Sequence, residues 1–128
     1  MKKKILIVVA DYYKKISFNL VKSAKKEINN ICNIKIIKVP GVFEIPVTIS
    51  KNIKKYDGFI ALGCVIKGKT PHFDFISKAT TDSIMKLSVD FKKPIGNGII
   101  TCLTMNQAIN RNQKGKEASR AVISVLSQ

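Results

Sequence analysis

Residues 58–75 read GFIALGCVIKGKTPHFDF, and this stretch sets the architecture of the chain. Its first part, from Gly58 to Val65, is a short continuous apolar run, which is typical of a strand covered on both faces. Gly68 and Pro71 then interrupt the run. Helical spacing of apolar residues begins at His72, the only histidine in the chain. The stretch therefore predicts a strand that runs directly into a helix.

Short apolar runs and helical patterns alternate along the whole chain, without an internal repeat or a low-complexity linker. This alternation favours βαβ units and a parallel sheet. The Val- and Ile-rich runs do not alternate with polar residues, which fits strands that are buried on both faces. The expected strands are Lys4–Ala10, Asn33–Val39, Gly58–Val65 and Gly98–Leu103.

Helices are expected between these strands, because apolar residues recur there with helical spacing. The three stripes are Ile16, Leu20, Ala24 and Ile28; Ile45, Ile49 and Ile53; and Phe73, Ile76, Thr80, Ile84, Leu87 and Phe91. Pro46 is tolerated because it lies in a first helical turn. A short helix from Met105 to about Arg111 and a last one over Lys114–Leu126 complete the chain. We expect a three-layer α/β/α sandwich with a four-stranded parallel sheet, flavodoxin-like in its strand order 2-1-3-4.

Ligands of such sheets bind beyond the carboxyl ends of the strands. In this chain the segments expected there are 11–13, 40–44, 66–72 and the residues from Thr104 onward. These segments are therefore where functional side chains are to be sought.

The composition favours one cytoplasmic globular domain over residues 1–128. A chain of this length buries roughly two-thirds of the surface that it exposes when unfolded. No apolar run approaches the ~20 residues of a membrane helix, and the run after the N-terminal lysines is too short for a secretory signal. Cys32, Cys64 and Cys102 lack C-x-x-C spacing and, with one histidine, give no zinc pattern, so buried free thiols are expected.

The formal net charge of +15 is poorly organised for nucleic-acid binding. All but two of the 23 basic residues are lysines, and they are scattered over every segment. A dedicated nucleic-acid binder clusters its charge and favours arginine. We therefore expect small-molecule substrates, with neither a nucleic acid nor a membrane as partner, although the positive field would steer anionic substrates inward.

Residues 63–70 also fit the nucleotide-binding pattern G-x-x-x-x-G-K-[ST]. Such a loop needs a flexible arc of backbone N–H groups, whereas Val65 and Ile66 are stiff and strand-like. A magnesium-binding aspartate should end a later strand, yet the only good candidate, Asp11, ends the first one. A nucleotide-binding module is therefore the weaker hypothesis. Gly68–Thr70, at a helix start, still offers amide donors and a hydroxyl to a phosphate.

Several segments taken together resemble the lumazine synthase family, whose members make 6,7-dimethyl-8-ribityllumazine for riboflavin biosynthesis. The matching segments are VPGVFEIP (39–46), ALGCVIKGKTPHFDF (61–75), PIGNGIIT (94–101), Gln107-Ala108 with Arg111, and Lys114-Gly115 with Glu117-Ala118. The resemblance extends from about Ile5 to Leu126. The order and spacing of V-P-G-x-F-E-I-P and G-x-T-x-H-F-D make it specific.

The resemblance implies a transferase that needs no metal or organic cofactor. Its substrates would be 5-amino-6-(D-ribitylamino)uracil and 3,4-dihydroxy-2-butanone 4-phosphate, which condense with release of phosphate and water. The implied steps are imine formation, proton transfers, loss of phosphate, ring closure and dehydration. The resemblance also implies a homo-oligomer, with the site between two neighbouring subunits of a pentamer, which some relatives stack into larger shells.

By the same resemblance, His72 is the proton-transfer residue, a role that suits an imidazole because its two ring nitrogens can accept and donate protons. Arg111 is the phosphate ligand, because a guanidinium matches a phosphate with two parallel hydrogen bonds. Lys69 and Thr70 would complete the phosphate cradle, and Lys114 would help electrostatically. From the residues alone, a helix-start histidine that caps and a solvated helix-end arginine remain open.

The resemblance assigns the other substrate to residues near the first three strand ends. The Tyr12 ring would stack on the pyrimidine, and Glu44 would bind ribityl hydroxyls, with Val42 and Phe43 contacting the same substrate. Main-chain groups of Cys64, Val65 and Ile66 would line the pyrimidine. From the residues alone, Glu44 could equally be a first-turn residue favoured by the helix dipole, and Tyr12 a locally packed side chain.

The chain departs from the family pattern at several positions. Asp11 and Tyr13 stand where many relatives have other polar residues. Asn97 stands where phenylalanine, packing on the substrate from the neighbouring subunit, is common, so either an amide hydrogen bond replaces that contact or the contact is absent. Only Asn112 and Gln113 separate Arg111 from Lys114, fewer residues than is common, and the N-terminus is short. These departures leave open the assembly size and a catalytically silent flavin- or lumazine-binding shell protein.

Overall fold

The computed structural model describes residues 2–68 and 71–128 and contains a four-stranded parallel sheet. Its strands are β1 (Lys3–Ala10), β2 (Cys32–Val39), β3 (Gly58–Ile66) and β4 (Ile95–Cys102). The strand order is β2-β1-β3-β4, so the predicted order 2-1-3-4 is confirmed. β1 and β3 are the two central strands, and every residue of β1 from Ile5 to Ala10 is buried.

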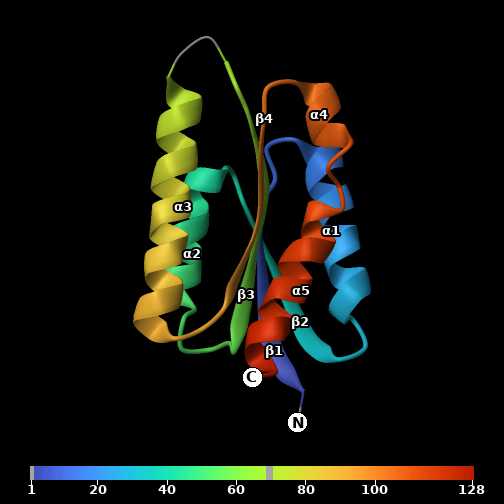
Figure 1. Ribbon diagram of the computed structural model, residues 1–128, viewed down its shortest axis with the longest axis vertical. Coiled ribbons are helices and arrows are strands. Elements are labelled where there is room, and N and C mark those ends of the chain that lie inside the picture. The colour runs from blue at the N-terminus through green and yellow to red at the C-terminus, as the bar shows by residue number, and fades with distance from the viewer. Residues whose placement is uncertain (1, 69–70) are drawn as a thin grey trace.

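Helices cover both faces of the sheet, as Figure 1 shows. On one face lie α2 (Ile45–Lys51), with the short 3-10 turn η1 (Val42–Glu44) before it, and α3 (His72–Phe91). On the other face lie α1 (Lys14–Ile28), α4 (Met105–Ile109) and α5 (Lys114–Leu126). The expected three-layer α/β/α sandwich is therefore confirmed. Within the described residues, no helix combines the length and the apolar character that a bilayer crossing requires.

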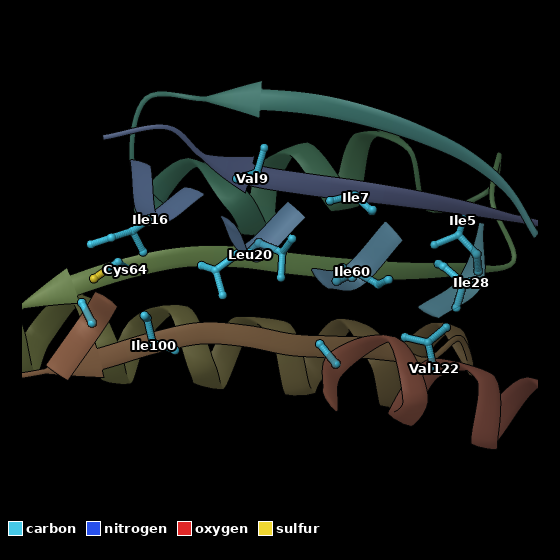
Figure 2. Packing of buried hydrophobic residues seen from close by; sticks show 14 of the residues in the cluster. Ile5, Ile7, Val9, Ile16, Leu20, Ile28, Ile60, Cys64, Ile100 and Val122 are labelled. Atoms are coloured by element: carbon cyan, nitrogen blue, oxygen red, sulfur yellow. The ribbon is translucent and has the colours of Figure 1, made fainter. Parts of the chain in front are cut away.

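Two hydrophobic clusters hold the three layers together. Alternation along β1 sends Ile5, Ile7 and Val9 to the cluster under α1 and α5, which Figure 2 shows from close by. Leu6 and Val8 point to the cluster under α2 and α3. Cys32, Cys64 and Cys102 are buried free thiols, as expected.

Three local predictions need adjustment. β4 begins at Ile95 rather than Gly98, because Ile95 and Gly96 already pair with Phe59 and Ile60 of β3. α2 ends at Lys51, so Ile53 joins the core from the turn that follows the helix. Phe91, the last residue of α3, is 44% exposed and lies outside the buried stripe of that helix.

β4 and α5 approach each other so closely that the strand needs glycine at the crossing. A Cβ atom on Gly96 would collide with the carbonyl oxygen of Ala118 and would lie 3.0 Å from a methyl group of Val122. The colliding atom belongs to the backbone of α5, so a side-chain rotation cannot relieve the contact. The start of β4 is thus fixed by the fit between two elements rather than by strand propensity.

Gly96→Ala should lower the free energy of unfolding by about 1–3 kcal/mol, the usual cost of overpacking a filled core. Gly68→Ala is the matched control, because a Cβ atom at Gly68 meets nothing within 4 Å. Guanidinium denaturation of both variants and the parent gives the comparison. Equal stability of the two variants would show that α5 can shift away from β4 without cost.

Candidate active site

The turn after β1 carries Tyr12 on a firmly held backbone. The Asp11 N–H donates to the carbonyl oxygen of Val39 at 2.9 Å, which ties the turn to the end of β2. The buried Ser17 hydroxyl donates to the carbonyl oxygen of Ala10 at 2.6 Å, which ties the first turn of α1 to the end of β1. The Tyr12 side chain is 73% exposed. The strand ends therefore fix the Tyr12 backbone and leave its ring at the surface.

The turn after β2 is closed by the Glu44 carboxylate. The Gly41 N–H donates to Glu44 Oε1 at 2.9 Å, and the Glu44 N–H donates back to the Gly41 carbonyl at 3.2 Å. Between these residues, Val42 is buried and Phe43 is 62% exposed. The hydrogen bond to Gly41 uses one carboxylate oxygen of Glu44 and fixes the direction of the group.

The end of β3 supplies mainly backbone. The Lys67 N–H donates to the Cys102 carbonyl at 2.9 Å, which continues the β3–β4 ladder past Ile66. Burial, together with the nearby Cys102, raises the pKa of the Cys64 thiol to about 12. A thiol with such a pKa is protonated at neutral pH and is a poor nucleophile. Cys64 is therefore suited to offer main-chain groups rather than a reactive sulfur.

The nucleotide-loop hypothesis is weakened by the same strand. Gly63 to Ile66, the first half of the pattern, lie inside β3, where their backbones pair with β4. They do not form the open arc of amide donors that such a loop requires. Lys69 and Thr70, the end of the pattern and part of the predicted phosphate cradle, lie outside the described residues.

These three strand ends and the start of α3 enclose one cleft of about 660 Å³, here called the main cleft. Eight predicted site residues line it: Tyr12, Val42, Phe43, Glu44, Cys64, Val65, Ile66 and His72. His72 is the first residue of α3, where its exposed side chain stands at the rim of the sheet. An aromatic ring, a carboxylate, an imidazole and strand-end backbone in one cleft can hold a polar heteroaromatic molecule and move protons on it.

A second cleft of about 440 Å³, here called the basic cleft, lies between β4 and the start of α5. Arg111 and Lys114 line it, together with Thr101 and Glu117. Arg111 Nη1 donates to the Thr101 carbonyl at 3.3 Å, which holds the guanidinium beside β4. Two cations in one concave surface suit an anion such as a phosphate.

One chain does not bring all of the predicted residues together. Arg111 and Lys114 are not among the described residues that line the main cleft, and His72 is not among those of the basic cleft. Asn97 belongs to neither set. It is exposed on β4, where its Oδ1 accepts the Ile99 N–H at 3.0 Å. The histidine and the arginine therefore occupy separate surfaces of the same chain.

Sequence reasoning missed several residues that line the clefts. Tyr13, Gly41 and Ile76 line the main cleft, and Thr101 and Glu117 line the basic cleft. Ile76 was expected only as part of a helix stripe. Gly41 and Glu117 lie inside segments that match the lumazine synthase pattern, so the resemblance could have indicated them as site residues. Tyr13 stood out only as a departure from the family pattern.

Comparison with known proteins gives one consistent result. The family model described as 6,7-dimethyl-8-ribityllumazine synthase matches residues 2–128. A protein of that name from Corynebacterium kroppenstedtii is 38% identical over 128 residues, which cover 94% of this chain and 80% of that protein. The one from Aliarcobacter butzleri is 37% identical over 134 residues, covering 96% and 86% respectively. The one from Streptomyces avermitilis is 35% identical over 135 residues, covering 97% and 83%.

The raised pKa of Cys64 predicts that iodoacetamide at pH 8 leaves this thiol unmodified in the native protein, because alkylation requires the thiolate and access to it. In guanidinium the same thiol should react fully. Mass spectrometry of peptides from both states measures the modification. Equal rates of Cys64 alkylation in the native and unfolded protein would contradict the assignment.

Proposed function

The chain belongs to the 6,7-dimethyl-8-ribityllumazine synthase family, and on this premise we propose that it performs the reaction of that family in riboflavin biosynthesis. The reaction condenses 5-amino-6-(D-ribitylamino)uracil with 3,4-dihydroxy-2-butanone 4-phosphate and releases phosphate and water. The single observation that carries the proposal is the main cleft, where eight of the residues expected from the family pattern lie around one space. Within this function we assign roles to individual residues and a shape to the assembly.

The main cleft binds the ribitylaminouracil. The exposed Tyr12 ring offers a stacking surface for the pyrimidine, and the Glu44 carboxylate, oriented by the Gly41 N–H, accepts hydrogen bonds from ribityl hydroxyls. Main-chain groups at the end of β3 form hydrogen bonds with the polar edge of the pyrimidine. Because the Cys64 thiol is protonated, it takes no part in bond formation.

The basic cleft holds the phosphate of the second substrate. The Arg111 guanidinium binds the phosphate oxygens, and Lys114 adds positive charge beside it. As phosphate leaves, these cations stabilise the charge that develops on its oxygens. Lys69 and Thr70 are proposed to complete the cradle from the segment before α3.

Positioning contributes most of the rate enhancement, because an amine and a ketone condense without activation by a metal or an organic cofactor. Holding two reactants in line can supply up to ~7–11 kcal/mol of the barrier. His72 stands at the main cleft, where it transfers protons during imine formation and phosphate loss.

We further propose that the complete site forms between two copies of the chain. The main cleft of one copy then faces the basic cleft of its neighbour, which brings His72 and Arg111 to one substrate pair. Such a head-to-tail contact joins two different surfaces, and it closes into a ring when the rotation permits. A pentamer is the proposed ring. Asn97, exposed on the edge strand β4, would reach the neighbour's substrate in this arrangement.

The proposed setting is the cytoplasm, with residues 1–128 acting as one domain and without a nucleic-acid or membrane partner. Three free cysteines fit a reducing compartment. A catalytically silent flavin- or lumazine-binding shell protein is the less favoured alternative, because both His72 and Arg111 are present. Formation of the lumazine chromophore from the two precursors distinguishes these functions.

His72→Ala should lower kcat while leaving the KM of both substrates within about twofold, since proton transfer contributes ~10²–10⁴-fold and binding rests on other groups. We expect the lower end of that range, because the uncatalysed condensation proceeds on its own. Absorbance of the lumazine gives both constants. If the His72→Ala variant had the kcat of the parent, His72 would not be a proton-transfer residue.

Arg111→Ala should instead raise the KM of the phosphorylated ketone by at least about tenfold, because a charge-assisted bidentate contact is lost. Arg120→Ala is the matched control. Arg120 is the only other arginine, and its Nε donates to Glu27 at 2.7 Å between α1 and α5. If both substitutions raised the KM of the ketone equally, Arg111 would act only through the net charge of the protein and not as a phosphate ligand.

Mixing the two damaged chains tests the shared site. If His72→Ala and Arg111→Ala chains are unfolded together and refolded, about one quarter of the contacts in a ring pair two undamaged clefts. At a ketone concentration well below the KM of the parent, activity near that fraction of the parent is expected, whereas each variant refolded alone stays impaired. Light scattering should show a particle of five 14.2 kDa chains. No recovery in mixed particles would place both residues in sites within single chains.

A further inference from the structure

Two consecutive tyrosines at the end of β1 have opposite environments. Tyr12 is 73% exposed, and Tyr13 is half-buried against the cluster under α1 and α5. Both line the main cleft. An exposed side chain samples several rotamers, and fixing one of them on binding costs conformational entropy. A tyrosine that serves as a stacking surface therefore binds its ligand more tightly if another group already holds its ring in the binding orientation.

The neighbouring ring provides such a hold. The centroids of the two rings lie 4.8 Å apart, and their planes are 86° from each other, an edge-to-face contact. This geometry is favoured, because the positive edge of one ring meets the negative face of the other, and it contributes about 0.5–1.5 kcal/mol beyond buried area. The contact leaves much of the Tyr12 side chain available at the surface.

Both the backbone and the ring of Tyr13 are held in place, the ring by packing against the cluster under α1 and α5. Its carbonyl oxygen accepts the Ser17 N–H at 2.9 Å in the first turn of α1. Burial raises the pKa of the Tyr13 hydroxyl, and Cys64 and Tyr12 add to the effect, so the phenol stays neutral at physiological pH. A neutral ring packed on the core can keep its orientation while the cleft fills and empties.

We propose that Tyr13 is a positioning residue, whose core-anchored ring holds the exposed Tyr12 ring in the orientation that stacks on the pyrimidine of the ribitylaminouracil. This inference rests on the proposed function, because it takes the pyrimidine as the group that Tyr12 meets. Tyr13 acts through its aromatic ring. Its hydroxyl is not required.

The test measures the affinity of the protein for the ribitylaminouracil alone by titration calorimetry, alongside the KM of each substrate. Tyr13→Leu should weaken that affinity and raise the KM of the ribitylaminouracil by about threefold to tenfold, the value of one aromatic pair. The KM of the phosphorylated ketone should stay within about twofold. Tyr13→Phe, which keeps the aromatic ring, should bind like the parent.

The matched control is Tyr56→Leu. Tyr56 forms an edge-to-face pair with Phe59 at a centroid distance of 6.0 Å, and it lies before the amino end of β3, away from both clefts. This variant loses an aromatic pair without touching the site, so its affinity for the ribitylaminouracil should equal that of the parent. If Tyr13→Leu fails to fold, Tyr13→Met, which fills the space without a ring, replaces it.

A double-mutant cycle decides whether Tyr13 acts through Tyr12. In a Tyr12→Leu background, Tyr13→Leu should change the affinity by less than about twofold, because the ring that it holds is gone. An undiminished loss in that background would overturn the proposal, as would a Tyr13→Phe variant as weak as Tyr13→Leu. If the parent binds the ribitylaminouracil but forms no lumazine, the proposed reaction fails while the cycle still tests the positioning role.

Discussion

Parallel pairing of β3 with both β1 and β4 is the constraint on which the rest of the structure depends. The register of the sheet pairs Val9 of β1 with Leu62 of β3, and Cys102 of β4 with Ile66 of β3. The carboxyl ends of all three strands therefore lie at the same edge of the sheet, here called the rim. The residues that follow the strands are held at that rim by hydrogen bonds. The Asp11 N–H after β1 donates to the Val39 carbonyl, the Lys67 N–H after β3 to the Cys102 carbonyl, and the Leu103 N–H after β4 to Gln107 Oε1. Helices on both faces then bury the strands and leave the rim as the accessible edge.

Local patterns in the sequence predicted the sheet and the segments that lie at its rim, whereas the individual site residues came from the family resemblance. Apolar runs mark the strands, and topology alone places the residue after each strand at the rim. The start of β4 was missed since Gly96 and Gly98 are weak strand formers, and their place is set by the close approach of α5. The contact between the Tyr12 and Tyr13 rings was also out of reach, because side-chain rotamers decide it.

The separation of Arg111 from His72 within one chain does not follow from local patterns. Both residues follow strands of one sheet, and the residues alone left the role of each open. The guanidinium, however, is held beside the edge strand β4 by the Thr101 carbonyl, and the short connection to Lys114 leads straight into α5. Where a neighbouring copy would lie depends on surface complementarity over many residues, which no local pattern encodes. The family resemblance implies an intersubunit site, and the proposed pairing of the two clefts between neighbouring copies rests on that implication.

The division of the proposed site into two clefts has a consequence for how the protein responds to its own abundance. If the site forms between copies as proposed, a solitary chain would carry two incomplete halves and would turn nothing over, so specific activity would fall on dilution once rings dissociate. A defect in one cleft would disable one contact and leave the other cleft of the same chain usable, so activity in mixed rings would fall only in proportion to the number of damaged clefts. The concentration of the protein in the cell, and not only the activity of each site, would then set the rate of lumazine formation.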